Sequence, residues 1–295
     1  MIKIIPEPKK TSLYAQDNIR ISPYLFTNSP LWQKYAEVFS DAVSSVYEVS
    51  LESKPGGIEL IEDKTILPGH YVLDSREGLK LKASDDEGIC YALASALQIT
   101  EVKAGELFVP SVHIEDYPDK DYRGFMLDLG RKWHTFDKLL KYIDLCFLYK
   151  IKYFNLHFTD TNLYTLPSKA FPELPAKNMH YSFEQIEYLN EYAKKRGIVI
   201  IPEFECPGHA PQLNKAYPEV FADKFDEEVT TEFYTETGAL VNAHDIICAG
   251  SENAWDGTKA LIREICEMFP DAPYINIGGD EANIKMWNHC SVCRE

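Results

Sequence analysis

The strongest chemical signal in the sequence is the segment Gly278-Gly279-Asp280-Glu281, which follows the apolar run 274–277. Two glycines allow the backbone to leave a strand tightly, and they leave open space for a substrate ring held against the strand end. Neighbouring strand residues point to opposite faces, so both carboxylates enter one pocket only if the strand has ended or bulged at this point. The alternative is a loop before a helix whose amino terminus is stabilised by acidic residues.

Polar side chains also follow three other predicted strands. They come directly after apolar runs: Asp128 and Arg131, then His157 and Asp160, then Glu203, Glu205 and His209. Functional groups beyond the carboxyl ends of parallel strands are typical of the catalytic face of a barrel. An open doubly wound sheet would gather them in the same way, but no glycine-rich nucleotide-binding motif follows any of these strands. Glu203 and Glu205 could equally form ion pairs at a barrel rim.

Alternating strands and helices must hold these groups. The apolar pattern predicts strands near 125–128, 151–158, 198–204 and 274–277, with helices near 136–149, 182–196 and 253–269 between them. Such alternation implies a buried parallel sheet. We therefore predict an α/β fold, a TIM-type (β/α)8 barrel, in residues 116–295. Only about four βα units are present, and a whole barrel takes about 250 residues, so we expect truncation after the fourth strand.

Residues 1–115 are predicted to form a smaller α+β domain that precedes the barrel. Apolar spacing of three and four residues predicts a helix over 31–47, and a second helix is expected over 87–99. Asp85 or Asp86 would cap the second helix. Short β-prone runs at 58–61, 71–73 and 79–82 are separated by turn residues and predict the sheet.

The charge balance and the cysteines limit the class of protein. Thirty Lys and Arg against 46 Asp and Glu give a net charge of −16, which argues against nucleic acid and anionic membranes as partners. No apolar run approaches the roughly 20 residues that cross a bilayer. Seven cysteines, an odd number scattered through apolar segments, favour a reduced cytoplasmic protein, although a secreted form with its signal removed stays open.

The Cys290-x-x-Cys293 pair could be half of a zinc ribbon. The sequence offers no second pair at a suitable spacing, so we interpret these residues as two unrelated thiols. We predict no metal site and no cofactor.

Four ordered motifs carry a resemblance to a known family. They are YRGFMLDLGR at 122–131, NLHFTD at 155–160, IPEFECPGH at 201–209 and GGDE at 278–281. Together they resemble glycoside hydrolase family 20, the exo-acting β-N-acetylhexosaminidases. GHYVL at 69–73 and GICYAL at 88–93 resemble the α+β domain that commonly precedes the barrel in this family, so the resemblance covers nearly the whole chain.

The resemblance implies retaining hydrolysis of terminal β-linked N-acetylglucosamine or N-acetylgalactosamine from a glycan or glycoconjugate, with the substrate's 2-acetamido oxygen as the nucleophile. By position, Glu281 would be the general acid and base, and Asp280 would orient the acetamido group and stabilise the oxazolinium-like intermediate. Arg131 would hold sugar hydroxyls, or form a buried ion pair instead. Asp160 and His209 would position the acid.

Several residues depart from the family pattern, among them residues 162–165, which replace the usual Gln-Gly-Trp-Arg stretch. Asn276 stands where the family usually has His, Thr161 replaces the second acid of an Asp-Asp pair, and Glu205 replaces an Asp. These changes surround the pocket, so they bear on specificity more than on reaction type.

Two other functions are compatible with the same residues. One is a non-catalytic glycan-binding or assembly module made from a truncated barrel. The other is a metal-dependent hydrolase that uses His157, Glu205, His209 and Asp280, although the family uses no metal. Half a barrel would also leave sheet edges and apolar surface uncovered, which predicts self-association or a second chain that completes the barrel.

Overall fold

The computed structural model describes residues 3–224, 232–234, 240–242 and 245–295. The chain divides into two compact units. The first comprises Met1–Gly124, Lys141–Lys152 and Tyr192–Ile198, and the second comprises Phe125–Leu140, Tyr153–Glu191 and Val199–Glu295. The units therefore do not follow a single cut in the chain, and the domain boundary at residue 115 stays a prediction.

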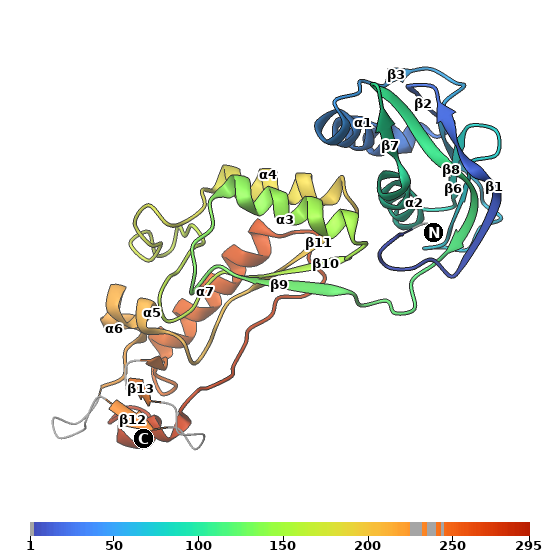
Figure 1. Cartoon of the computed structure of the whole chain (residues 1–295). Helices are drawn as coiled ribbons and strands as arrows, with labels where there is room; N and C mark the ends of the chain where they lie inside the picture. The colour runs from blue at the N-terminus through green and yellow to red at the C-terminus, as the bar shows by residue number, and fades with distance from the viewer. Residues whose placement is uncertain (1–2, 225–231, 235–239, 243–244) are drawn as a thin grey trace. The chain divides into compact units, whose positions relative to one another are not determined.

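The first unit is built on an eight-stranded mixed sheet of order β1-β8-β5-β6-β4-β2-β3, in which β7 also pairs with β8 (Figure 1). Its strands are β1 (Lys10–Ile21), β2 (Tyr24–Thr27), β3 (Glu52–Ser53), β4 (Ile58–Glu62), β5 (Tyr71–Asp74), β6 (Leu79–Ala83), β7 (Glu101–Lys103) and β8 (Glu106–Asp116). Buried and half-buried residues alternate along β5 and β6, as expected for strands with one covered face.

Two helices share the hydrophobic core of this sheet, and both were predicted. They are α1 (Gln33–Tyr47), which follows the 3-10 turn η1 (Pro30–Trp32), and α2 (Asp86–Ile99). Asp85 caps α2, because its side chain accepts a hydrogen bond of 2.9 Å from the Gly88 N–H.

The second unit contains a three-stranded sheet of order β11-β10-β9. The strands are β9 (Gly124–Asp128), β10 (Tyr153–His157) and β11 (Val199–Glu203). The longer helices are α3 (Phe136–Leu148), α4 (Phe183–Lys194) and α7 (Glu252–Met268), and the shorter elements are α5 (Pro211–Ala216), α6 (Pro218–Phe221), β12 (Glu232–Tyr234), β13 (Leu240–Asn242) and the 3-10 helix η3 (Ile284–His289). Strands β10 and β11 are parallel, which agrees with the predicted βα alternation.

The fourth predicted strand does not form as predicted. Residues 274–277 make only an isolated parallel bridge, between Asn276 and Glu203. Backbone hydrogen bonds from Phe204 to Asn276 and from Cys206 to Ile277 hold the segment beside β11. Among the described residues no strand pairs with the other side of this segment.

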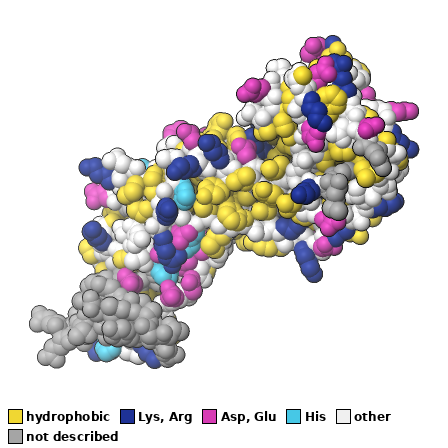
Figure 2. Space-filling view, viewed as in Figure 1, with side chains coloured by type: hydrophobic (Ala, Val, Ile, Leu, Met, Phe, Trp, Pro, Cys, Tyr) yellow, Lys and Arg dark blue, Asp and Glu magenta, His cyan; other side chains and the backbone are white. Residues whose placement is uncertain are grey.

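Apolar side chains remain exposed on this unit. Figure 2 shows hydrophobic side chains gathered over its strands. Phe125, Met126 and Ile277 are 40 %, 50 % and 51 % exposed. No helix in the described ranges is both long and apolar enough to span a bilayer.

Candidate active site

A buried polar network lies on one face of β10 and β11. Asn155 Nδ2 donates to Glu203 Oε2 at 2.6 Å, and His157 Nδ1 lies 2.6 Å from Glu203 Oε1. Asn276 Nδ2 donates to the same Glu203 Oε2 at 2.7 Å. Residues 155 and 157 share a face because the side-chain period of a strand is two, and residue 203 is the register partner of residue 157.

His157 lies between two carboxylates. Its Nε2 is 2.8 Å from Asp160 Oδ2, while Nδ1 contacts Glu203. Burial alone would lower the pKa of His157, but the hydrogen bonds to Asp160 and Glu203 outweigh burial and raise this pKa to about 10. The ring is therefore protonated at neutral pH and ties the two carboxylates together.

Asp160 links this network to Arg131. Asp160 is 1 % exposed, and its Oδ2 lies 3.0 Å from a terminal nitrogen of Arg131. Arg131 makes a second ion pair with Asp128 at 2.9 Å. Burial would raise the pKa of Asp160, but the hydrogen bond to His157, a backbone N–H and nearby positive charges outweigh burial and lower it. Asp160 is therefore a carboxylate at neutral pH.

His209 connects Asp160 with Glu281. Its Nδ1 lies 3.2 Å from Thr161 Oγ1 and 3.7 Å from Asp160 Oδ1. Its Nε2 lies 3.5 Å from Glu281 Oε2 and is buried without a hydrogen bond among the described residues. A small approach of the Glu281 carboxylate would complete this hydrogen bond.

Glu205 was considered from the sequence as a rim ion pair or a metal ligand, but not as part of the hydrolytic site. It is 1 % exposed, and Gly279 N–H donates to its Oε2 at 3.2 Å. A Cβ atom on Gly278 would lie 2.0–2.2 Å from the Glu205 carboxylate atoms, so a side chain at residue 278 would displace it. Burial raises the pKa of Glu205 to about 7; the Gly279 N–H opposes this shift and the charge of Asp280 adds to it.

Asp280 and Glu281 lie at the exposed end of this network. Gly278 and Gly279 have φ of 59° and 98°, so the chain has left the extended conformation before the two acids, as the sequence required. Ligand atoms of His209, Asp280 and Glu281 lie within 4.8 Å of one another. The structure thus brings together the predicted site residues Arg131, Asp160, His209, Asp280 and Glu281.

The four residues expected to bind a metal in the metal-dependent alternative do not gather at one point. His157 groups with Glu203 and Glu205, whereas His209 groups with Asp280 and Glu281. Both nitrogens of the His157 ring already contact carboxylates of the network, Glu203 through Nδ1 and Asp160 through Nε2. Glu203 and Glu205 belong to the network rather than to a row of ion pairs with lysines or arginines.

Comparison with known proteins decides the family. Residues 121–295 match the profile described as glycosyl hydrolase family 20, catalytic domain, and residues 1–117 match glycosyl hydrolase family 20, domain 2. This chain belongs to glycosyl hydrolase family 20. The predicted fold class, a partial TIM-type barrel preceded by an α+β domain, is confirmed by these matches and by the structural neighbours.

Several relatives are beta-hexosaminidases. The protein of Porphyromonas gingivalis is 27% identical over 100% of this chain and 40% of its own length. That of Akkermansia muciniphila is 30% identical over 74% of this chain and 46% of its own length. The chain therefore spans less than half the length of these two curated relatives.

Solved structures of the family have the same fold. An exo β-N-acetylglucosaminidase from Vibrio harveyi, solved in complex with N-acetylglucosamine, matches with a TM-score of 0.88 and 24% identity, over 99% of this chain and 48% of that chain. The β-N-acetylhexosaminidase of Bacteroides fragilis matches with a TM-score of 0.80 and 27% identity, over 99% of this chain and 58% of that chain.

Proposed function

We propose that the protein carrying this chain is an exo-acting, retaining β-N-acetylhexosaminidase that uses the substrate's 2-acetamido oxygen as its nucleophile. Its substrates would be glycans that end in β-linked N-acetylglucosamine or N-acetylgalactosamine. Membership of the family and the beta-hexosaminidases among the relatives support this reaction class. The observation that carries the proposal is the contact chain from Arg131 through Asp160 and His209 to Glu281, with Asp280 beside it.

Glu281 is assigned the proton transfers. It would protonate the leaving glycosidic oxygen and then take a proton from the attacking water. Its side chain is 55% exposed, so it can reach a substrate, and His209 Nε2 lies 3.5 Å behind its carboxylate. Asp160 lies 3.7 Å from the other ring nitrogen, so His209 stands between Asp160 and Glu281, which supports a role in orienting Glu281.

Asp280 is assigned the role of orienting the substrate's acetamido group. Its carboxylate would accept the acetamido N–H and stabilise the positive charge that forms when the acetamido oxygen attacks the anomeric carbon. The position of Asp280 directly beside Glu281 and within 4.8 Å of His209 supports this division of labour.

The buried carboxylates of the network are poorly suited to act as a protein nucleophile. Glu203 is 4 % exposed and accepts hydrogen bonds from Asn155 and Asn276 besides its contact with His157. Glu205 is 1 % exposed beneath Gly278. These contacts support attack by a group of the substrate. Arg131 is 48% exposed and can offer N–H groups to sugar hydroxyls beyond its two ion pairs.

Replacement of Glu281 tests the assignment in the full-length protein. Glu281→Gln removes the transferable proton, so turnover of an alkyl N-acetylglucosaminide should fall by at least about 100-fold, because its leaving group needs protonation. A dinitrophenyl substrate should lose far less, because its leaving group departs without a proton. The exposed Glu267→Gln on α7 is the control and should change neither rate.

Two results would contradict the proposal. Equal losses with both leaving groups would remove Glu281 from the acid role. Binding of N-acetylglucosamine by a wild-type protein that hydrolyses neither substrate would instead support a non-catalytic glycan-binding module.

A further inference from the structure

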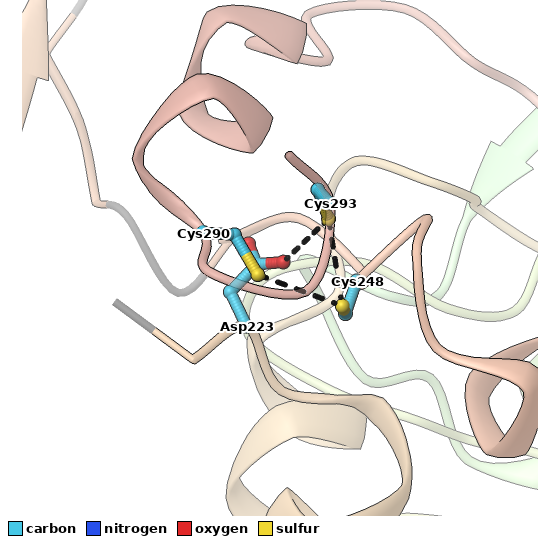
Figure 3. Close-up of side chains that lie close together, drawn as sticks. All are labelled: Asp223, Cys248, Cys290 and Cys293. Carbon is cyan, nitrogen blue, oxygen red and sulfur yellow. Dashed lines mark hydrogen bonds between the residues drawn. The ribbon is translucent and has the colours of Figure 1, made fainter. Parts of the chain in front are cut away.

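Four side chains outside the active site converge on one point in the second unit. Figure 3 shows Asp223, Cys248, Cys290 and Cys293 directed toward one another. They come from the segment just after α6, from the segment before α7 and from the segment after η3. One ligand atom from each lies within 4.8 Å of all the others. The interpretation of Cys290 and Cys293 as unrelated thiols is therefore wrong, because the fold adds Cys248 and Asp223 to the pair.

The spacing of these atoms matches a tetrahedral zinc site. Zinc bound to sulfur at 2.3 Å in a tetrahedron places the sulfur atoms about 3.8 Å apart. Cys248 Sγ lies 3.7 Å from Cys290 Sγ and 3.5 Å from Cys293 Sγ, and Cys293 Sγ lies 3.9 Å from Asp223 Oδ1. A disulfide would need two sulfur atoms about 2.0 Å apart and would leave the third thiol and the carboxylate unused.

The carboxylate gives a second, independent indication of a cation. Asp223 is 8 % exposed, and its Oδ2 is buried with no hydrogen-bond partner among the described residues. A divalent cation at the centre of the cluster would give this buried oxygen a partner.

Backbone N–H groups lie against two of the three sulfur atoms. Lys224 N–H points to Cys290 Sγ at 3.4 Å, and Gly250 N–H points to Cys293 Sγ at 3.3 Å. Donors placed in this way can hydrogen bond to sulfur ligands around a metal ion.

We propose that Asp223, Cys248, Cys290 and Cys293 bind one structural Zn²⁺ ion. All four positions are filled by protein side chains, which is the closed coordination of structural rather than catalytic zinc, and three thiolates select zinc over magnesium or calcium. The Cys-x-x-Cys spacing of residues 290 and 293 is the usual half of such a site. No step of the proposed hydrolysis uses this ion.

The ion would fasten the segment that follows the catalytic acids. Met286 of η3 is buried against Ile246, and Trp287 Nε1 donates to the Ile247 carbonyl at 3.0 Å. Ile247 N–H in turn donates to the Pro207 carbonyl at 2.8 Å, on the loop that carries His209. A metal tie at Cys290 and Cys293 would therefore hold the loops of Glu281 and His209 together.

Metal analysis of the full-length protein, purified without chelators, tests the site without reference to activity. We expect one zinc per chain, and X-ray absorption at the zinc edge should give three sulfur ligands near 2.3 Å and one oxygen ligand. Cobalt reconstitution should give an intense thiolate-to-metal absorption band and visible bands typical of tetrahedral cobalt. Cys248→Ser, Cys290→Ser and Cys293→Ser should each lower the zinc content by half or more.

Cys266→Ser is the matched control, because Cys266 is an exposed thiol on α7 outside the cluster, and it should keep the full zinc content. The proposal would be overturned if the purified wild-type protein contained no zinc and did not bind added cobalt. So would zinc retained in all three cluster variants, or a disulfide between two of these cysteines in protein prepared under reducing conditions. If the variants do not fold, the X-ray absorption and cobalt spectra of the wild-type protein test the site by themselves.

Discussion

Gly278→Ala is predicted to damage the active-site network through Glu205. Gly278 has φ of +59°, and a left-handed conformation costs alanine about 1 kcal/mol. The new Cβ would also lie 2.0–2.2 Å from the Glu205 carboxylate, which must then leave its hydrogen bond with the Gly279 N–H. Loss of a hydrogen bond to a charged or buried carboxyl adds about 1.5–3 kcal/mol, so the expected loss of stability is about 2.5–4 kcal/mol.

Gly279→Ala is the matched control in the same segment. Its φ is +98°, but its added Cβ would meet nothing closer than the Cys206 carbonyl oxygen at 3.8 Å. Only backbone strain of about 1–2 kcal/mol is expected. Urea unfolding of the full-length variants measures both losses by linear extrapolation.

A double-mutant cycle isolates the contact. In a Glu205→Ala background the carboxylate is absent, so Gly278→Ala should cost only the strain of about 1 kcal/mol. Equal losses for Gly278→Ala and Gly279→Ala, or a Gly278→Ala loss that stays the same without Glu205, would refute the reasoning.

Two more outcomes are expected. The pKa of Glu205 is raised from 4.5 to about 7, so between these pH values the folded state keeps a proton that the unfolded chain releases, and the stability of the folded state falls as the pH rises through 7. Wild type should lose about 3 kcal/mol of stability over this range relative to Glu205→Gln. Parallel pH profiles of the two proteins in urea unfolding would contradict this. A polypeptide limited to residues 1–295 should self-associate through apolar side chains such as Phe125, Met126 and Ile277, and a monodisperse monomer in light scattering would count against it.

The regular elements were predictable where one physical pattern dominated. Apolar spacing located α1, α2 was expected with an aspartate cap, and βα alternation located β9, β10 and β11. The long strands β1 and β8 were not predicted: β8 carries Pro110 in its centre, and β1 changes register between Leu13 and Asn18. The segment 274–277 has the composition of a strand, but strand formation depends on partners that local sequence does not specify.

The site residues that lie within the sequence motifs were predictable. Arg131, Asp160, His209, Asp280 and Glu281 all lie in segments that match the family pattern, and the structure gathers them. The pairing of His157 with Glu203 was beyond local sequence, because it depends on the register between β10 and β11.

Glu205 offered a signal that was noticed but not used, namely a longer acid where the family usually has Asp. The cysteine cluster was hidden for a different reason, because Cys248 lies 42 residues before Cys290 and only the fold brings them together.

Attack by the substrate's own acetamido oxygen is tested most directly by a series of aryl N-acylglucosaminides with increasing fluorination of the acyl group. Fluorine withdraws electrons from the amide oxygen and leaves the aryl leaving group unchanged. The value of kcat/KM for the full-length protein should therefore fall steeply from the acetyl to the trifluoroacetyl substrate, because the nucleophile is weakened in the transition state. A flat series, or a covalent sugar ester trapped on Asp or Glu, would contradict the proposed mechanism.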